Sequence, residues 1–154
     1  MKKRVLLPVI CLCFVLSGCS IVQFTYMRNL SEYTAEIYFD LDAKGLTSIP
    51  DSIYVPYSAT SHQVNKKTYS FMTDSIVAKR YTGTTIVLHV PSGGMIMFDK
   101  TTLRKIGYMA PEKIKVKLPG KDPYTVRVVG PVESGEKVFQ TKGNSPKLYW
   151  YDIY

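Results

Sequence analysis

Apolar and polar residues alternate along several short stretches of this chain. In residues 33–42 every second residue is apolar, which puts Ala35, Ile37 and Phe39 on one side. A period of two places successive side chains on opposite faces of a β-strand, so this stretch predicts a strand with one buried face. Similar runs predict strands at residues 21–26, 52–55, 85–90, 95–98, 114–118, 124–129 and 148–151. Residues 101–106 alone have the spacing of a helical turn.

Turn-forming residues separate these runs. Glycine, proline, asparagine or aspartate clusters occur at residues 44–45, 50–51, 91–94, 119–123 and 143–146. Short strands divided by such turns are typical of all-β sandwiches. We therefore predict an all-β fold, an antiparallel β-sandwich that is immunoglobulin-like in the broad sense. The cysteine and tryptophan spacing of antibody domains is absent.

The N-terminal segment contains all three cysteines of the chain, Cys11, Cys13 and Cys19. Three basic residues at positions 2–4 precede an apolar run at positions 5–15. This layout is typical of a secretory signal, and the run is shorter than the roughly 20 apolar residues of a membrane span. A metal site or a disulfide framework would spread its cysteines differently.

The end of this segment, Leu16-Ser17-Gly18-Cys19, resembles the lipobox of bacterial lipoproteins. The resemblance implies that residues 1–18 are a signal peptide that is removed, and that residues 19–154 form one lipid-anchored domain. It also implies a covalent lipid on Cys19; no other cofactor is expected. An uncleaved signal-anchor helix is the alternative interpretation.

The resemblance also suggests a location in the cell envelope. Ser20 follows the cysteine where an aspartate would retain a lipoprotein in the inner membrane, so we expect the outer membrane, facing the periplasm. Two or more acyl chains hold a protein stably on a membrane. Without the signal peptide the chain keeps 17 Lys and Arg against 12 Asp and Glu, a net charge of about +5. This mild excess favours anionic envelope components and does not indicate a nucleic-acid partner.

Lys113, Lys115 and Lys117 alternate with apolar residues and share one face of a predicted strand. Three ammonium groups in a row are suited to the phosphate of lipid head groups or to an acidic glycan. Lysines on an exposed edge strand also discourage aggregation, which is the structural interpretation of the same pattern.

Aromatic residues are concentrated at the C-terminus, where Tyr149, Trp150 and Tyr151 are consecutive. Exposed rings stack on sugars and anchor protein interfaces. These three residues are therefore candidates for a binding surface. The alternative is a terminal strand whose rings pack into the core.

The other chemically active residues form no complete motif. His62 and His89 are the two histidines, and no nucleophile elbow surrounds a serine. Residues 40–45 imitate the start of a calcium loop, but Lys44 occupies a ligand position, so no metal site is expected. Asn29 begins a glycosylation sequon, which we interpret as a chance match in a bacterial lipoprotein.

From these observations we expect a non-enzymatic, lipid-anchored envelope protein, a structural or accessory component that binds another envelope protein. The alternative is a module that binds a glycan or a lipid head group through exposed Tyr, Trp and Lys residues. A hydrolase is the third hypothesis, and it requires a histidine beside a carboxylate and a nucleophile.

Overall fold

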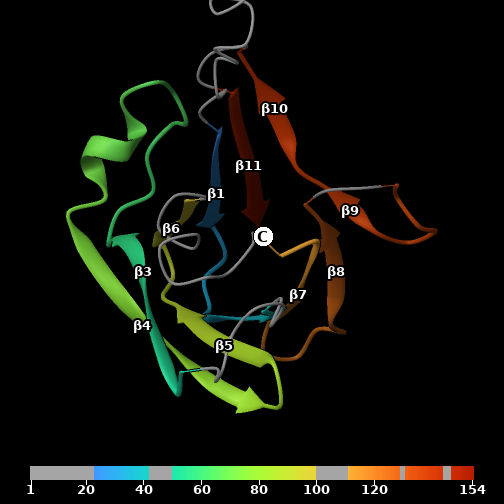
Figure 1. The fold of residues 1–154 in the computed structure, drawn as a ribbon. Helices are drawn as coiled ribbons and strands as arrows, with labels where there is room; N and C mark the ends of the chain where they lie inside the picture. Colours follow the sequence, from blue (N-terminus) through green and yellow to red (C-terminus); the bar gives the residue numbers. More distant parts are fainter. Residues whose placement is uncertain (1–22, 42–49, 100–110, 129–130, 144–146) are drawn as a thin grey trace, which may run out of the picture.

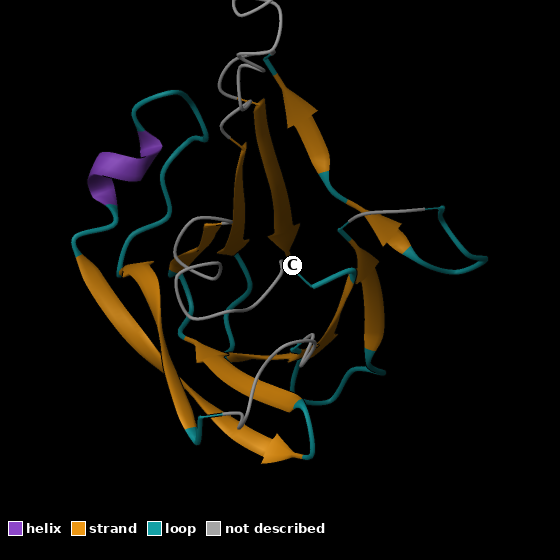
Figure 2. Cartoon of the chain, viewed as in Figure 1, coloured by secondary structure: helices purple, strands orange, loops and turns teal. Residues whose placement is uncertain are grey.

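The described residues fold into a single 11-stranded sheet (Figure 1). This computed structural model describes residues 23–41, 50–99, 111–128, 131–143 and 147–154. Its elements are β1 (Gln23–Asn29), β2 (Ala35–Asp40), β3 (Ser52–Ser58), the 3-10 helix η1 (Thr68–Phe71), β4 (Asp74–Thr82), β5 (Thr85–Val90), β6 (Met95–Asp99), β7 (Lys113–Lys117), β8 (Tyr124–Arg127), β9 (Lys137–Val138), β10 (Gln140–Lys142) and β11 (Lys147–Ile153). Strands dominate the chain, as Figure 2 shows, and the predicted all-β class is confirmed.

The strands lie in the order β10-β11-β1-β6-β3-β4-β5-β2-β7-β8-β9. Most neighbours are antiparallel, but β1 is parallel to β11 and β8 is parallel to β9. The predicted division into two sheets of an immunoglobulin-like sandwich is not confirmed, since hydrogen bonds join the described strands into one mixed sheet.

The sheet curls so that its inner face packs against itself. The alternating residues Ala35, Ile37 and Phe39 of β2 are buried, as the period of two predicts. The Phe39 ring meets the Phe98 ring edge to face, with centroids 5.4 Å apart, although β2 and β6 are not neighbours in the sheet. One hydrophobic core therefore serves both halves of the sheet.

Phe139 closes the curl. It is the single residue between β9 and β10, which end the sheet order on opposite sides. Its side chain is buried, and its ring centroid lies 5.8 Å from that of Tyr151. The two edges of the sheet are thus joined by one residue of backbone and one buried ring, and we call this junction the seam.

A second, smaller cluster covers the outer face of β1, β6 and β11. Its buried members are Tyr26, Val64, Met95, Met97 and Leu148. Val64 comes from the segment between β3 and β4, so this connection lies over the strands. Phe24, Met72 and Trp150 pack against the cluster and stay partly exposed.

The structure differs from the predicted strands in several places. The sequence did not predict the strand β4, because apolar and polar residues do not alternate along it. Val77 is exposed, and the position two after buried Ala78 is the charged Arg80. Tyr33 was expected to share the buried face of β2 but precedes the strand and is half exposed. The predicted helical turn at residues 101–106 lies outside the described residues.

Replacement of Phe139 by alanine should open the seam. We expect the free energy of unfolding to fall by about 3 kcal/mol, because a buried aromatic ring is replaced by a cavity. Urea denaturation measures this loss, and hydrogen exchange should rise in β9 and β10. The neighbouring Val138 is exposed, so Val138→Ala is the matched control and should change stability by no more than about 0.5 kcal/mol. Equal effects of the two substitutions would contradict the role of the seam.

Candidate functional site

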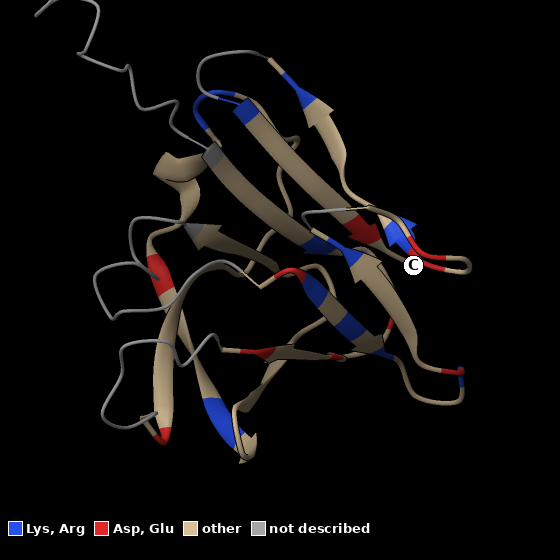
Figure 3. Ribbon diagram, turned by 45° about the vertical axis from the view of Figure 1, so that its right-hand side comes forward, with Lys and Arg blue, Asp and Glu red and all other residues tan. Residues whose placement is uncertain are grey.

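A groove of about 490 Å³ lies on the outer face of the sheet, over β2, β4, β5, β7 and β8. Because β7 alternates between exposed and buried residues, its three lysines point away from the core that holds Ile114 and Val116. All three, Lys113, Lys115 and Lys117, line the groove. The basic positions of the protein are blue in Figure 3. The lysine surface predicted from the sequence is thus the cationic wall of a concave site.

Strand register aligns the polar side chains across this face. Tyr38 of β2 is the partner of Lys115 on β7, and Lys115 is in turn the partner of Thr125 on β8. Tyr38 is also the partner of Val87 on β5. A single row across four strands therefore combines a ring, an ammonium group and a hydroxyl.

Two tyrosine rings meet in the groove. Tyr38 and Tyr81 lie edge to face, with centroids 5.4 Å apart and planes at 79°. Tyr81 is 64% exposed, so most of its ring is open to a ligand. Aromatic faces next to hydroxyl and ammonium groups are a combination suited to sugars, which present both C–H and polar edges.

The acidic residues around the groove already have partners. The Tyr38 hydroxyl donates to Glu36 Oε2 at 2.5 Å, and Lys117 Nζ lies 3.2 Å from the same oxygen. On the next strand, Arg127 pairs with Glu136 and Glu133. Among the described residues, neither Lys113 nor Lys115 forms an ion pair. Two of the three ammonium groups therefore remain available to an anion.

Proton binding within this group is coupled. The hydrogen bond from Tyr38 lowers the pKa of Glu36 below its ordinary value, with Lys117 adding to the effect. The same hydrogen bond raises the pKa of Tyr38 to about 12, with partial burial and the Glu36 charge adding to it. Tyr38 is consequently a neutral donor at neutral pH, and Glu36 is ionised.

The C-terminal aromatic residues do not line this groove. Tyr151 is buried against Phe139 and Tyr124 in the core. Trp150 packs on the second cluster, and Tyr149 is half-buried with Lys147 Nζ 5.2 Å from its ring centroid. The structure thus separates the predicted aromatic candidates from the predicted lysine candidates and directs Tyr151 inward.

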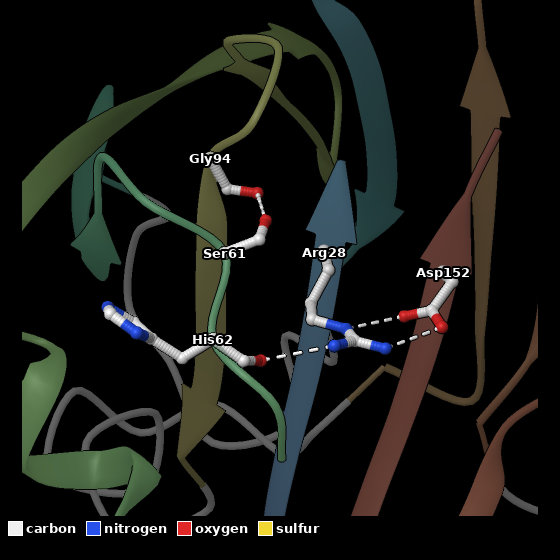
Figure 4. Close-up of polar contacts among 5 residues, drawn as sticks. All are labelled: Arg28, Ser61, His62, Gly94 and Asp152. Carbon is white, nitrogen blue, oxygen red and sulfur yellow. Dashed lines mark hydrogen bonds and ion pairs between the residues drawn. The ribbon is translucent and has the colours of Figure 1, made fainter. Parts of the chain in front are cut away.

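A partly buried ion pair holds β1 to β11 (Figure 4). The Arg28 guanidinium donates to Asp152 through Nε at 2.7 Å and through a terminal nitrogen at 2.6 Å. Its other nitrogen donates to the His62 carbonyl oxygen at 3.2 Å, and the nearby Ser61 hydroxyl donates to the Gly94 carbonyl oxygen at 3.1 Å. Such a bidentate pair fixes geometry, and here it fastens the β3–β4 connection to β1 and β11.

The two histidines lie in separate places. The His62 ring stacks on Phe71 with centroids 4.3 Å apart. His89 is exposed on β5 and is the register partner of Glu36. Within the described parts of the chain, neither imidazole has a hydrogen bond to a hydroxyl or a carboxylate, so the geometry required by the hydrolase hypothesis is not seen there.

Two weaker motifs also receive a structural explanation. Asn29 of the sequon is fully buried, and its amide nitrogen donates to the carbonyl oxygens of Tyr33 and Val90, so the folded chain does not present it for glycosylation. In the calcium-like segment, Asp40 accepts a hydrogen bond from Thr85, and residues 42–45 lie outside the described residues. No cluster of three or more His, Cys, Asp or Glu capable of holding a metal ion occurs in the described regions.

Sequence reasoning missed Tyr38 and Tyr81 as site residues. Tyr38 carried a usable signal, because it falls on the polar side of the 33–42 alternation. Tyr81 belongs to β4, whose pattern is irregular, and only the pairing of β4 with β5 brings it near Tyr38. Cys19, the predicted lipidation site, lies outside the described residues.

Comparison of the chain with models of protein families, with curated proteins and with solved structures gave no match. The described part of the chain contains no helix with the length and apolar character needed to cross a membrane. The geometry of the groove must therefore carry the functional argument.

Substitution Glu36→Gln should bring the pKa of Tyr38 down from about 12 towards its ordinary value of 10. Since the folded state favours the neutral phenol, the stability from this hydrogen bond is complete below pH 10 and is lost as the pH rises towards 12. Tyrosinate absorbance during alkaline titration, compared with and without Tyr38→Phe, isolates this group. Asp40→Asn on the same strand is the control. An unchanged Tyr38 titration in Glu36→Gln would contradict the assigned hydrogen bond.

Proposed function

We propose that this protein is a non-enzymatic, lipid-tethered binding module of the bacterial cell envelope that holds an acidic glycan in the groove. The observation that carries the proposal is the pair of ammonium groups, Lys113 and Lys115, that have no ion-pair partner among the described residues and lie beside Tyr38 and Tyr81.

The chemistry of the groove suits an extended, negatively charged sugar chain. Alternate residues on a strand lie about 7 Å apart, so Lys113 and Lys115 offer two separate contacts to carboxylates along one ligand. The open Tyr81 ring provides a surface for a sugar face, and Thr85 and Thr125 add hydroxyls to the lining. These groups can all be explained by ligand binding, without a catalytic reaction.

Tethering makes a modest affinity sufficient. Exposed charge contacts are individually weak, often below about 1 kcal/mol. The lipid on Cys19 would confine the domain to the outer membrane, facing the periplasm, and so raise its effective concentration near any envelope component. This supports the role of an accessory protein at the membrane over that of an untethered, freely diffusing binding protein.

Another envelope protein is the second candidate partner. Tyr54 and Val77 are register partners on β3 and β4 and are 68% and 40% exposed. They form an exposed apolar pair on the strands β3 and β4, outside the lining of the groove. Exposed aromatic and aliphatic residues of this kind favour protein contacts.

The proposal also includes the arrangement of the sheet in layers. We infer that the two halves of the sheet, which meet through Phe39 and Phe98, act as the two layers of a sandwich-like domain. The shared core and the seam support this description.

Substitution Cys19→Ala should release the protein from membranes, because the acyl chains have no other carrier. Fractionation of cells, with mass spectrometry of the mature N-terminus, measures both anchoring and cleavage. Cys13→Ala is the matched control and should leave both unchanged. Equal sedimentation and maturation of Cys19→Ala and the parent would overturn the tether.

Removal of the groove lysines should weaken binding to an acidic oligosaccharide. For Lys115→Gln we expect about a threefold loss of affinity for hexagalacturonate, corresponding to about 0.7 kcal/mol. Titration calorimetry measures the affinity, which should also fall with added salt, while neutral maltohexaose should bind far more weakly. Lys142→Gln on β10 removes the same charge away from the groove and is the control. Equal losses in the two variants would indicate a non-specific charge effect and exclude the site.

A further inference from the structure

A second exposed surface lies where the described chain begins. It combines the start of β1, the start of β11, the end of β10 and the connection that carries η1. Strand register places Gln23 of β1 directly beside Lys147 of β11. The stacking of Phe24 on Tyr69 brings η1 to the same end. We call this surface the aromatic–lysine face, and it consists of Phe24, Lys66, Lys67, Tyr69, Phe71 and Lys142.

Its rings are exposed although their positions are fixed. Tyr69 is 56% exposed and Phe71 is 40% exposed. Each is nevertheless held by a stack: Tyr69 on Phe24 with centroids 6.0 Å apart and planes at 13°, and Phe71 on His62 at 4.3 Å. The His62 backbone is itself bound by Arg28. Large apolar rings that are rigidly presented to solvent indicate a surface that is covered in use.

The charge around these rings is mainly positive. Lys66 and Lys67 are exposed directly before η1, and Lys142 is exposed at the end of β10. Lys147 lies beside the first residue of β1, with its ammonium group next to the Tyr149 ring on the inner side of the sheet. Asp99, at the end of β6, is the register partner of Phe24. Rings flanked by lysines are the composition of surfaces that lie at a membrane interface, with rings among the head groups and ammonium groups on anionic lipid.

The chain between the predicted lipid and β1 is short, which keeps this face close to the membrane. Phe24 lies five positions after Cys19, and a fully extended chain of five steps spans at most about 18 Å. The start of β1, and the start of β11 beside it, therefore stay close to the acyl chains. This step rests on the lipid tether of the proposed function.

We propose that the aromatic–lysine face rests on the anionic membrane surface, with Tyr69 and Phe71 at head-group level. In Figure 1 the β4–β5 turn, which carries Thr82 and Thr85 of the groove, lies at the end of the molecule opposite to the start of β1. Docking by this face consequently directs the groove away from the membrane, towards soluble or wall-bound ligands. The lipid supplies attachment, and the face supplies orientation.

Tryptophan reporters test this orientation in the full, lipidated chain. Trp150 is the sole tryptophan, so Trp150→Phe provides a dark background. Into it are placed, one at a time, Tyr69→Trp and Phe71→Trp on the proposed contact face and Tyr81→Trp in the groove. Each protein is purified from membranes and reconstituted in vesicles of phosphatidylethanolamine and phosphatidylglycerol, with and without brominated lipid.

We expect a blue shift and quenching by brominated lipid for the reporters at positions 69 and 71, and neither change at position 81. Lys66→Gln with Lys67→Gln should reduce the quenching, as should replacing phosphatidylglycerol by phosphatidylcholine. Equal quenching at the three positions, or none, in a chain that remains bound to vesicles would overturn the orientation and leave the tether intact. A chain that carries no lipid and does not sediment with vesicles would overturn both. Near-ultraviolet circular dichroism shows whether each variant is folded, and the two contact-face reporters serve as replicates.

Discussion

The packing of one curled sheet against its own inner face is the constraint on which the rest of this structure depends. Phe39 meets Phe98 across the core although their strands are not neighbours, and Phe139 joins the two edges of the sheet. No cysteine follows Cys19, so no disulfide links the strands of the described sheet. Burial of apolar side chains, helped by the Arg28–Asp152 pair between the first and last strands, must supply the stability.

Apolar residues of β2 and β7 point inward, so the outer face of these two strands is polar. On β2 and β7 the outward residues are charged or hydroxylated, and strand register brings Tyr38 beside Lys115. Glu36, two residues before Tyr38 on β2, is paired with Lys117 and accepts the hydrogen bond from Tyr38. Among the described residues the groove therefore keeps two ammonium groups without an ion pair, Lys113 and Lys115, together with the Asp40 carboxylate that accepts a hydrogen bond from Thr85. The proposed preference for acidic ligands rests on this excess of positive charge.

The two surfaces have different physical characters and complementary roles in our proposals. The groove is concave and combines separate lysines with open hydroxyls and rings, which suits a hydrated, extended ligand. The aromatic–lysine face exposes the rings of Tyr69 and Phe71 beside lysines instead of enclosing them in a groove. This arrangement suits the mixed polar and apolar environment of lipid head groups. A short tether near one surface would leave the other free.

The sequence by itself determined the all-β class, the inward residues of β2 and β7 and the outward position of the three lysines, because a period of two is a local property of a strand. It also carried the prediction of lipid attachment at Cys19, which a short motif expresses. The burial of Tyr151 in the main core and the packing of Trp150, partly exposed, on the second cluster became clear only from the fold, since both faces of β11 are apolar and alternation does not choose between them. The partners of Lys115, the meeting of Tyr38 with Tyr81 and the closure at Phe139 depend on which strands become neighbours. Strand order arises from long-range packing, which no local pattern encodes.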